Sequence, residues 1–229
     1  MVELLLVFLK WPEPGLAKTR LIPALGPETA AAVYRLMAEA VIGATRLQAE
    51  YDRLLCFSPV DAEARIQGWF SGEAVWPQPE GDLGHRMTAA FAEGFERGAG
   101  RVVIIGTDVP ALTRATVETA FRALDSADVV LGPAHDGGYY LLALARPRPE
   151  LFDGIAWSTP EVLAATCARA DALGLRTRLL EAMNDVDTID DLAAAWSQLE
   201  PILAREPEVR DAVARILDRQ ARKGRFGAQ

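Results

Sequence analysis

Three positively charged residues lie in one short segment that follows the first apolar run of the chain. Lys10, Lys18 and Arg20 belong to residues 10–20 (KWPEPGLAKTR), with Gly15 between them. Backbone N–H groups and cations in such a loop can bind the oxygens of a di- or triphosphate. The segment is not a P-loop, because no glycine directly precedes Lys18. A solvated basic loop is the alternative, and this segment alone does not decide between the two.

Carboxylates in two distant parts of the chain are candidate metal ligands. Asp108 follows another apolar run, in residues 106–110 (GTDVP), where it could bind a hard divalent cation or cap the next turn. In residues 184–192 (NDVDTIDDL), a threonine and an aspartate three positions later predict a helix cap. That cap leaves Asp185 and Asp187 unexplained, and one of them is a candidate second ligand.

Glycine-containing segments offer further candidate contacts. Residues 135–140 (HDGGYY) join two apolar runs, and Gly137 and Gly138 there permit close approach to a ligand or, alternatively, a tight turn with positive φ. Residues 78–87 (QPEGDLGHRM) precede a predicted helix. In that segment Gly84 could approach a base or ribose.

Two larger side chains complete the candidate set. Arg86, at the start of the helix predicted after residue 83, could reach a phosphate. Trp157 is either part of an acceptor pocket or an aromatic anchor of the core.

The elements that must position these residues follow from the apolar pattern. Runs without alternation predict strands buried on both faces, at residues 4–9, 54–57, 102–105, 129–131 and 139–144. Helical spacing predicts helices over 27–47, 83–97 and 114–124, and a further helix capped at 158–160. A short strand is expected near 176–180. From residue 190 onward the pattern is helical again, with breaks at Pro201 and Pro207. Alternating strands and helices imply a parallel sheet covered on both faces, with ligands at the carboxyl ends of its strands.

Composition restricts the class of protein. Half of the 229 residues are hydrophobic, which suffices for one substantial core. The formal net charge of −8 argues against a general nucleic-acid or anionic-membrane binder. Cys56 and Cys167 form neither a disulfide framework nor a paired-cysteine metal site. No apolar stretch approaches the roughly 20 residues that span a bilayer, so we expect a cytoplasmic protein without membrane partners.

Taken in order, these motifs resemble one bacterial family of GT-A-fold, nucleotide-diphospho-sugar transferase-like proteins, some labelled arsenosugar-biosynthesis glycosyltransferases. The chain is more distantly similar to phospholactate and molybdenum-cofactor guanylyltransferases. The resemblance covers roughly residues 3–192. It implies a GT-A-like, mainly parallel α/β sheet with helices on both faces and a helical C-terminal tail. We therefore expect a transferase domain at residues 1–192 and a helical extension at 193–229 that packs on it.

The resemblance also implies roles for the candidate residues. Asp108 and Asp187 would hold Mg²⁺ or Mn²⁺, and Asp108 would also be a catalytic residue. Asp136, at a strand end, is the candidate for orienting the sugar or activating the acceptor. The nucleotide would contact Lys10, Gly15, Lys18, Arg20, Gly84, Arg86 and Thr107. The acceptor or sugar would contact Gly137, Gly138 and Trp157. The sequence departs from many GT-A enzymes because residues 107–109 carry one acid where those enzymes have Asp-x-Asp.

The sequence-based hypothesis is a divalent-metal-dependent transfer of a glycosyl group from a nucleotide sugar to a small-molecule acceptor. The alternative is a nucleotidyltransferase that joins NMP from an NTP to a phosphorylated metabolite and releases pyrophosphate. The three cations and the missing Asp-x-Asp favour this alternative, whereas the family label favours glycosyl transfer. A non-catalytic nucleotide-binding module is a third possibility. The sequence does not identify the nucleobase, the sugar, the acceptor or the oligomeric state.

Overall fold

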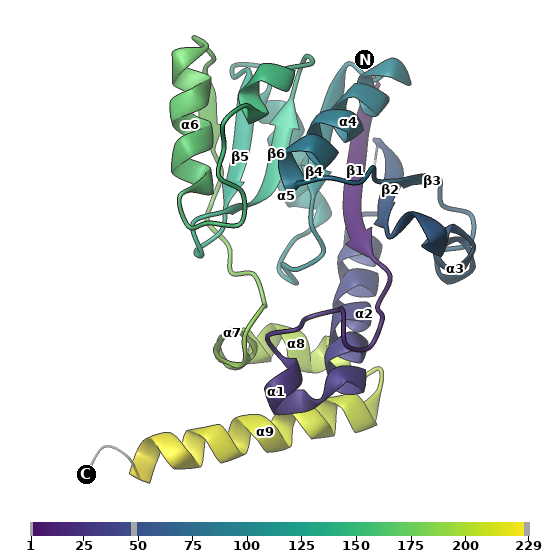
Figure 1. The fold of residues 1–229 in the computed structure, drawn as a ribbon, viewed down its shortest axis with the longest axis vertical. Helices are drawn as coiled ribbons and strands as arrows, with labels where there is room; N and C mark the ends of the chain where they lie inside the picture. Colours follow the sequence, from purple (N-terminus) through teal and green to yellow (C-terminus); the bar gives the residue numbers. More distant parts are fainter. Residues whose placement is uncertain (1, 47–49, 227–229) are drawn as a thin grey trace.

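A computed structural model describes residues 2–46 and 50–226 of the chain. Within these residues the strands form one seven-stranded sheet in the order β3-β2-β1-β4-β6-β5-β7 (Figure 1). The strands are β1 (Glu3–Lys10), β2 (Asp52–Ser58), β3 (Val75–Pro77), β4 (Arg101–Ile105), β5 (Val129–Pro133), β6 (Tyr139–Leu144) and β7 (Thr177–Leu179). All five apolar runs are strands, as predicted, and the short strand near residue 177 is present as well.

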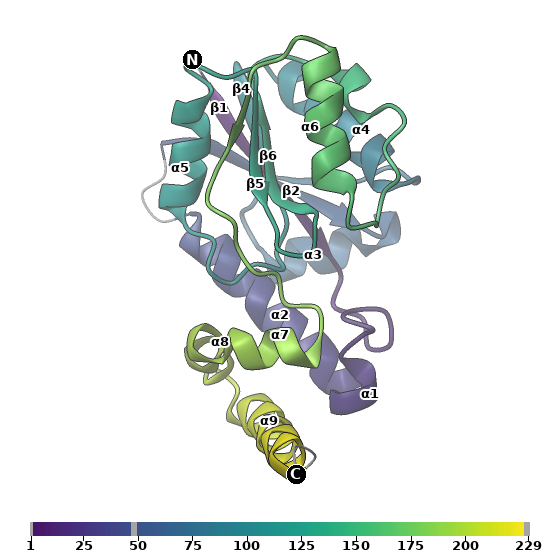
Figure 2. The same cartoon turned by 90° about the vertical axis from the view of Figure 1, so that its left-hand side faces the viewer.

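Helices cover both faces of this sheet (Figures 1 and 2). The helices in the described residues are α1 (Ile22–Leu25), α2 (Pro27–Ala44), α3 (Glu63–Trp69), α4 (Leu83–Glu96), α5 (Arg114–Ala123), α6 (Val162–Ala172), α7 (Ile189–Ala194), α8 (Trp196–Leu203) and α9 (Pro207–Phe226), and of these α2 to α6 pack on the sheet. Leu5 and Val7 of β1 pack with residues of α2, α3 and α5, whereas Leu4 and Leu6 pack with residues of α4 and α6. Burial on both faces explains why the strand sequences are continuously apolar.

The strand β6 is antiparallel to both of its neighbours, β4 and β5, whereas the other strand pairs are parallel. Residues 134–138 connect β5 to β6, and so short a connection can form a hairpin but not a parallel crossover. The expectation of a mainly parallel sheet is therefore confirmed, with one reversed strand that the simple alternation of strands and helices did not predict.

A third apolar cluster joins the C-terminal helices to the start of the chain. Residues of α7, α8 and α9 pack with Leu21, with residues of α1 and with the first half of α2, and Val186 is buried among them. We call α1, the first half of α2 and α7–α9 the helical lobe. The lobe lies beyond the carboxyl end of β1 (Figure 1), so the ends of the central strands face it. The division of the chain at residue 192 stays a prediction.

Several local predictions need correction. Residues 158–160 do not cap α6, which begins at Val162 after Glu161, and the Thr159 hydroxyl donates instead to the carbonyl of Ala156. Pro201 lies inside α8, so the break comes only before Pro207. The prediction placed the end of α2 at Leu47, which lies outside the described residues; the helix ends at Ala44.

Two short elements of the fold were not predicted from the sequence. The sequence pattern did not reveal α3 or the three-residue strand β3. No helix in residues 2–46 and 50–226 is long and apolar enough to cross a membrane.

Candidate active site

A cavity of about 690 Å³ opens at the carboxyl ends of β1, β2 and β4, where polar and charged residues gather. Seven of the residues predicted from the sequence line it: Lys10, Lys18, Arg20, Arg86, Thr107, Asp108 and Asp187. They come from the end of β1 and the loop that follows it, from α4, from the residues just after β4 and from the segment before α7. The fold therefore brings together segments from the first and last thirds of the described chain, at the edge where ligands of such sheets bind.

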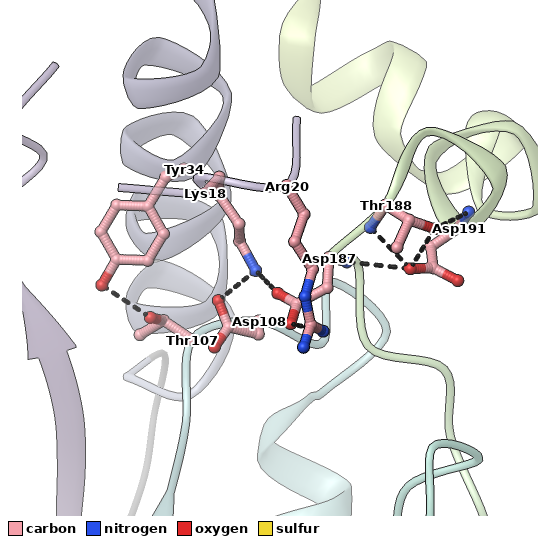
Figure 3. A network of polar contacts seen from close by, with 8 residues as sticks. All are labelled: Lys18, Arg20, Tyr34, Thr107, Asp108, Asp187, Thr188 and Asp191. Atoms are coloured by element: carbon pink, nitrogen blue, oxygen red, sulfur yellow. Dashed lines mark hydrogen bonds and ion pairs between the residues drawn. The ribbon is translucent and has the colours of Figure 1, made fainter. Parts of the chain in front are cut away.

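Lys18 is the centre of this arrangement (Figure 3). Its Nζ lies 2.6 Å from Oδ1 of Asp108 and 2.7 Å from Oδ1 of Asp187. The Lys18 side chain is only 4% exposed, whereas those of Asp108 and Asp187 are 47% and 38% exposed. The Lys18 backbone has φ of +47°, a left-handed conformation that is uncommon for a residue with a Cβ. Because buried ammonium groups need paired charges, the two carboxylates stabilise the loop that carries Lys18.

The segment that carries Asp187 is held in place by backbone hydrogen bonds. The Val186 N–H donates to the carbonyl of Asp108 at 2.9 Å, which ties the two acidic segments together directly. Thr188 caps α7 and forms a capping box with Asp191, as predicted. The Asp191 carboxylate also accepts from the N–H of Asp187 at 3.1 Å. The Asp187 carboxylate itself pairs with the Lys18 ammonium, and its Oδ2 lies 3.4 Å from Nη1 of Arg20.

Tyr34 of α2 links the ends of two strands beside this site, and Figure 3 shows its contact with Thr107. Its hydroxyl accepts from the N–H of Lys10 at 2.7 Å and lies 3.2 Å from Oγ1 of Thr107. Burial and the nearby Asp108 charge raise the pKa of Tyr34 to about 12, so the hydroxyl stays protonated. Sequence analysis missed Tyr34, because it lies inside a regular amphipathic helix and no local motif marks it.

Burial and charge act in opposite directions on the paired groups. Burial alone would lower the pKa of Lys18, but the carboxylates of Asp108 and Asp187 raise it well above its usual value. Burial alone would raise the pKa of Asp187, but Lys18 and then Arg20 hold it below its ordinary value. Lys18 and Asp187 are therefore both charged at neutral pH.

Asp185 behaves in the opposite way from its neighbour Asp187. Burial, followed by the charges of Asp136 and Asp187, raises its pKa to about 6. The side chain therefore titrates close to neutral pH. Because Asp136 belongs to the loop between β5 and β6, its effect on Asp185 links that loop electrostatically to the segment before α7.

Six of the predicted residues are not among the described residues that line the cavity: Gly15, Gly84, Asp136, Gly137, Gly138 and Trp157. Gly15 has φ of +88° within the first loop. A Cβ on Gly84 would lie 2.4 Å from Nε1 of Trp157, so the glycine makes room for the indole. Trp157 also contacts Phe152, with ring centroids 6.3 Å apart.

The loop between β5 and β6 is held by hydrogen bonds within itself and by backbone hydrogen bonds to Leu163 and Met183. Asp136 Oδ1 accepts from the N–H of Gly138 at 2.8 Å, an Asx-type turn. Gly137 has φ of +90°, and a Cβ there would lie 2.0 Å from the carbonyl oxygen of Pro160. Turn geometry and close packing therefore account for Gly137. The ligand-binding roles predicted for Asp136, Gly137 and Gly138 stay predictions.

The sequence analysis also assigned no role to Gln78, which lines the cavity. The Gln78 side-chain amide donates to the carbonyl of Cys56 at 2.6 Å, which fixes its orientation. Its Oε1 lies 3.5 Å from Nη1 of Arg86. A buried glutamine after a short strand has no sequence pattern that distinguishes it from a surface residue, so only the tertiary structure identifies it.

Asp108 and Asp187 are the carboxylates of this site that could hold a divalent cation. No cluster of three or more His, Cys, Asp or Glu side chains arranged to hold a metal occurs in the part of the chain that the structure describes. Asp108 and Asp187 nevertheless approach one common point, since both hold the same Lys18 nitrogen. Mg²⁺ is commonly bound by one or two carboxylates together with phosphate oxygens and water. The two residues fit such a shared site, in which the ligand supplies part of the coordination.

Comparison with known proteins places the chain in a family. A family model described as an uncharacterized protein conserved in bacteria, DUF2064, matches residues 41–159. The chain belongs to this family. It is also 30% identical over 180 residues to the phosphoenolpyruvate guanylyltransferase of Chloroflexus aggregans, a match that covers 76% of this chain and 87% of that relative.

Solved structures agree with this placement. A crystal structure from Desulfovibrio desulfuricans G20, provisionally described as a nucleotide-diphospho-sugar transferase, matches with a TM-score of 0.84 and 30% identity over 93% of this chain and 99% of that one. The CTP complex of CMP:2-keto-3-deoxy-manno-octonic acid synthetase matches with a TM-score of 0.53 and 14% identity over 90% of this chain and all of that one, which shows a shared fold. The chain therefore has a nucleotide-diphospho-sugar transferase fold, as its motif order predicted.

Proposed function

We propose that this protein is a divalent-metal-dependent transferase that moves a glycosyl group from a nucleotide sugar to a small-molecule acceptor. The observation that carries the proposal is the convergence of Lys18, Asp108 and Asp187 at the carboxyl ends of the strands. A carboxylate pair and neighbouring cations are the groups that a metal-bound diphosphate requires. The match to the Desulfovibrio protein over nearly its whole length supports a nucleotide sugar as the donor.

Each side chain of the site has a distinct task in this proposal. Asp108 and Asp187 would hold Mg²⁺ or Mn²⁺, which when bound neutralises the charge of the departing nucleoside diphosphate. Lys18 and Arg20 bind the phosphate oxygens, and Lys10 adds positive charge on the same side of the cavity. Tyr34 keeps the ends of β1 and β4 at a fixed separation, which positions the loops that carry these groups.

The acceptor side of the proposal rests on Asp136. This residue orients the sugar or accepts the proton of the attacking acceptor hydroxyl. The pKa of Asp185 supports a location near the other acids, because Asp136 contributes to raising it. Gly137, Gly138 and Trp157 would border the acceptor, with Trp157 held by its packing on Gly84.

Nucleotidyl transfer is the second candidate, and a specific observation favours it. The Chloroflexus relative is named a guanylyltransferase and matches over most of its length. In this reaction an acceptor phosphate attacks the α-phosphorus of an NTP, the bond to the β-phosphate breaks, and pyrophosphate leaves. Arg86 also lines the cavity, near Gln78, and could bind the second anionic substrate.

Phosphorus NMR distinguishes these candidates. The purified protein with Mg²⁺ is offered a pool of nucleotide sugars and, separately, a pool of nucleoside triphosphates with phosphorylated metabolites. Release of a nucleoside diphosphate from one nucleotide sugar supports glycosyl transfer and identifies the donor. Pyrophosphate release from one triphosphate replaces that proposal with nucleotidyl transfer. Binding without turnover in both pools, with broadened phosphorus lines, indicates a non-catalytic nucleotide-binding module.

A further inference from the structure

Lys18 holds the position at which the two proposed metal ligands meet. Its ammonium nitrogen contacts one oxygen of Asp108 and one of Asp187 at hydrogen-bond distances of 2.6 and 2.7 Å. Mg²⁺–oxygen distances are about 2.1 Å, so a metal bridging the same two oxygens would take the place of the ammonium rather than sit beside it. Lys18 and the metal therefore cannot both occupy this position.

We propose that Lys18 serves as an internal cation that occupies the metal position in the free protein and transfers to the phosphates of the arriving nucleotide, so that metal and nucleotide bind together. This inference rests on the proposed metal site and deepens it, because it assigns the order of binding. If Lys18 has this role, Mg²⁺ or Mn²⁺ alone binds weakly, because the metal must displace the Lys18 ammonium. The nucleotide supplies what the metal alone lacks, which is a new anionic partner for the displaced ammonium.

The charges of the site support this coupling. In the free protein, Lys18 and Arg20 balance Asp108 and Asp187, so the cluster is neutral. A divalent cation that arrives alone would leave two excess positive charges beside the Lys18 ammonium, which is costly because the Lys18 side chain is only 4% exposed and so is poorly stabilised by water. A diphosphate brings at least two negative charges and restores neutrality. The electrostatic cost of metal binding therefore disappears only when phosphate is present.

The burial of Lys18 distinguishes it from Arg20 in this role. The Arg20 side chain is 72% exposed and reaches only Asp187, at 3.4 Å, so it is a weak and screened partner. The Lys18 side chain is 4% exposed and contacts both acids. Lys18 also lines the cavity, so its flexible four-carbon stem can turn the ammonium toward a ligand there. Of these two cations, Lys18 alone therefore meets the geometric requirements for exchange with the metal.

Binding of Mn²⁺ alone, measured by electron paramagnetic resonance of the free ion, tests the proposal. We expect Lys18→Met to bind Mn²⁺ at least about 10-fold more tightly than the wild type, within the range typical of coupled sites. Lys18→Arg is the matched control, because it keeps a cation and should bind Mn²⁺ as weakly as the wild type. The double variant Lys18→Met with Asp108→Asn should lose the gain, which locates the new metal site.

A second measurement uses only the wild type and so does not depend on whether the variants fold. Calorimetric titrations with Mn²⁺, with tripolyphosphate and with both together should show weak binding of each alone and strong binding of the pair. Tight binding of Mn²⁺ alone to the wild type would overturn the proposal. A folded Lys18→Met protein that binds Mn²⁺ no more tightly than the wild type would also overturn it.

These outcomes are separable from failure of the proposed function. A gain of metal affinity in Lys18→Met, together with no turnover of any donor by the wild type, would support the role of Lys18 and refute the transferase. Turnover of a donor by the wild type, without a gain of metal affinity in Lys18→Met, would refute the role of Lys18 and leave the transferase intact.

Discussion

Two neighbouring parts of the cavity edge differ in how their polar groups are held. The charged site of Lys18, Asp108 and Asp187 joins side chains that are far apart in the sequence. The hairpin loop of residues 134–138, in contrast, is held mainly by backbone groups: Ala134 pairs with Gly138 inside the loop, His135 donates to the carbonyl of Met183, and the carbonyl of Gly137 accepts from Leu163. The comparison teaches that both regions are assembled by the tertiary structure, but the charged site depends on particular side chains, whereas backbone hydrogen bonds account for much of the shape of the loop.

The largest expected effect is on the charged site. Asp108→Ala removes one of the two carboxylates that meet at Lys18. We expect magnesium-dependent affinity for the donor to fall by about 100-fold or more, because a bound metal would lose a protein ligand and Lys18 a counter-charge. Calorimetry with and without Mg²⁺ measures this loss, and Asp153→Ala, which changes an exposed acid paired with Arg169, is the control. Unchanged affinity would remove Asp108 from the metal site.

The next effect concerns the hairpin loop. Asp136→Asn keeps an acceptor oxygen for the N–H of Gly138, so the turn should persist. If Asp136 acts on the acceptor, turnover should fall by about 10²-fold or more with donor affinity unchanged. Comparison of kcat with the donor Kd gives the answer. A loss of donor affinity instead would assign Asp136 to the donor site, and the two regions would then share the same role.

Packing behind the hairpin loop gives a stability effect. Gly84→Ala places a Cβ 2.4 Å from Nε1 of Trp157, and overpacking of this kind costs about 1–3 kcal/mol. Urea denaturation should show this loss. Gly43→Ala, in α2, meets no atom within 4 Å and is the matched control, for which we expect no loss. If Gly84→Ala proves neutral, the indole of Trp157 is free to move and is not a fixed wall of an acceptor pocket.

A similar effect is expected where Tyr34 supports the charged site. Tyr34→Phe leaves the Lys10 N–H without its acceptor and should reduce the free energy of unfolding by about 1–2 kcal/mol. Tyr51→Phe is the control, because the Tyr51 hydroxyl donates to the carbonyl of Thr45. Both variants should lose stability, but only Tyr34→Phe should weaken donor binding. Equal donor affinity in both would limit Tyr34 to a structural role.

The smallest effect tests the electrostatic link between the two regions. Asp185 has a pKa of about 6, raised by burial and by charges from Asp136 and Asp187. Since its folded-state pKa lies above the unfolded value, the charged form opposes folding, and stability decreases as pH rises through about 6. Asp185→Asn should therefore be more stable than the wild type at pH 7 in EDTA, and this advantage should vanish below about pH 4. A pH-independent difference would show that Asp185 does not sense the other acids.

Much of the fold could be predicted from the sequence because the strands are buried on both faces. Short, continuous apolar runs such as residues 102–105 are typical of strands covered by helices on both sides, and the capping box of α7 is a local pattern. Seven predicted residues do gather at one edge, because carboxyl ends of parallel strands meet on one side of a sheet, and ligand binding at this edge stays a prediction. The three-residue strand β3 and helix α3 were missed, since short elements lack a measurable period.

What the sequence by itself determined is the identity of the charged residues and their place after particular strands. Only the tertiary structure decided their pairing. Lys18 and Asp187 are separated by most of the chain, and packing of the helical lobe brings their segments together by burying Val186 and Leu21 in one apolar cluster. A separate apolar cluster, in which α2 packs with Ala17 and Trp69, gives Tyr34 its partners at two strand ends. Local patterns report hydrogen bonds between near neighbours, whereas burial of a distant helix is a property of the whole fold.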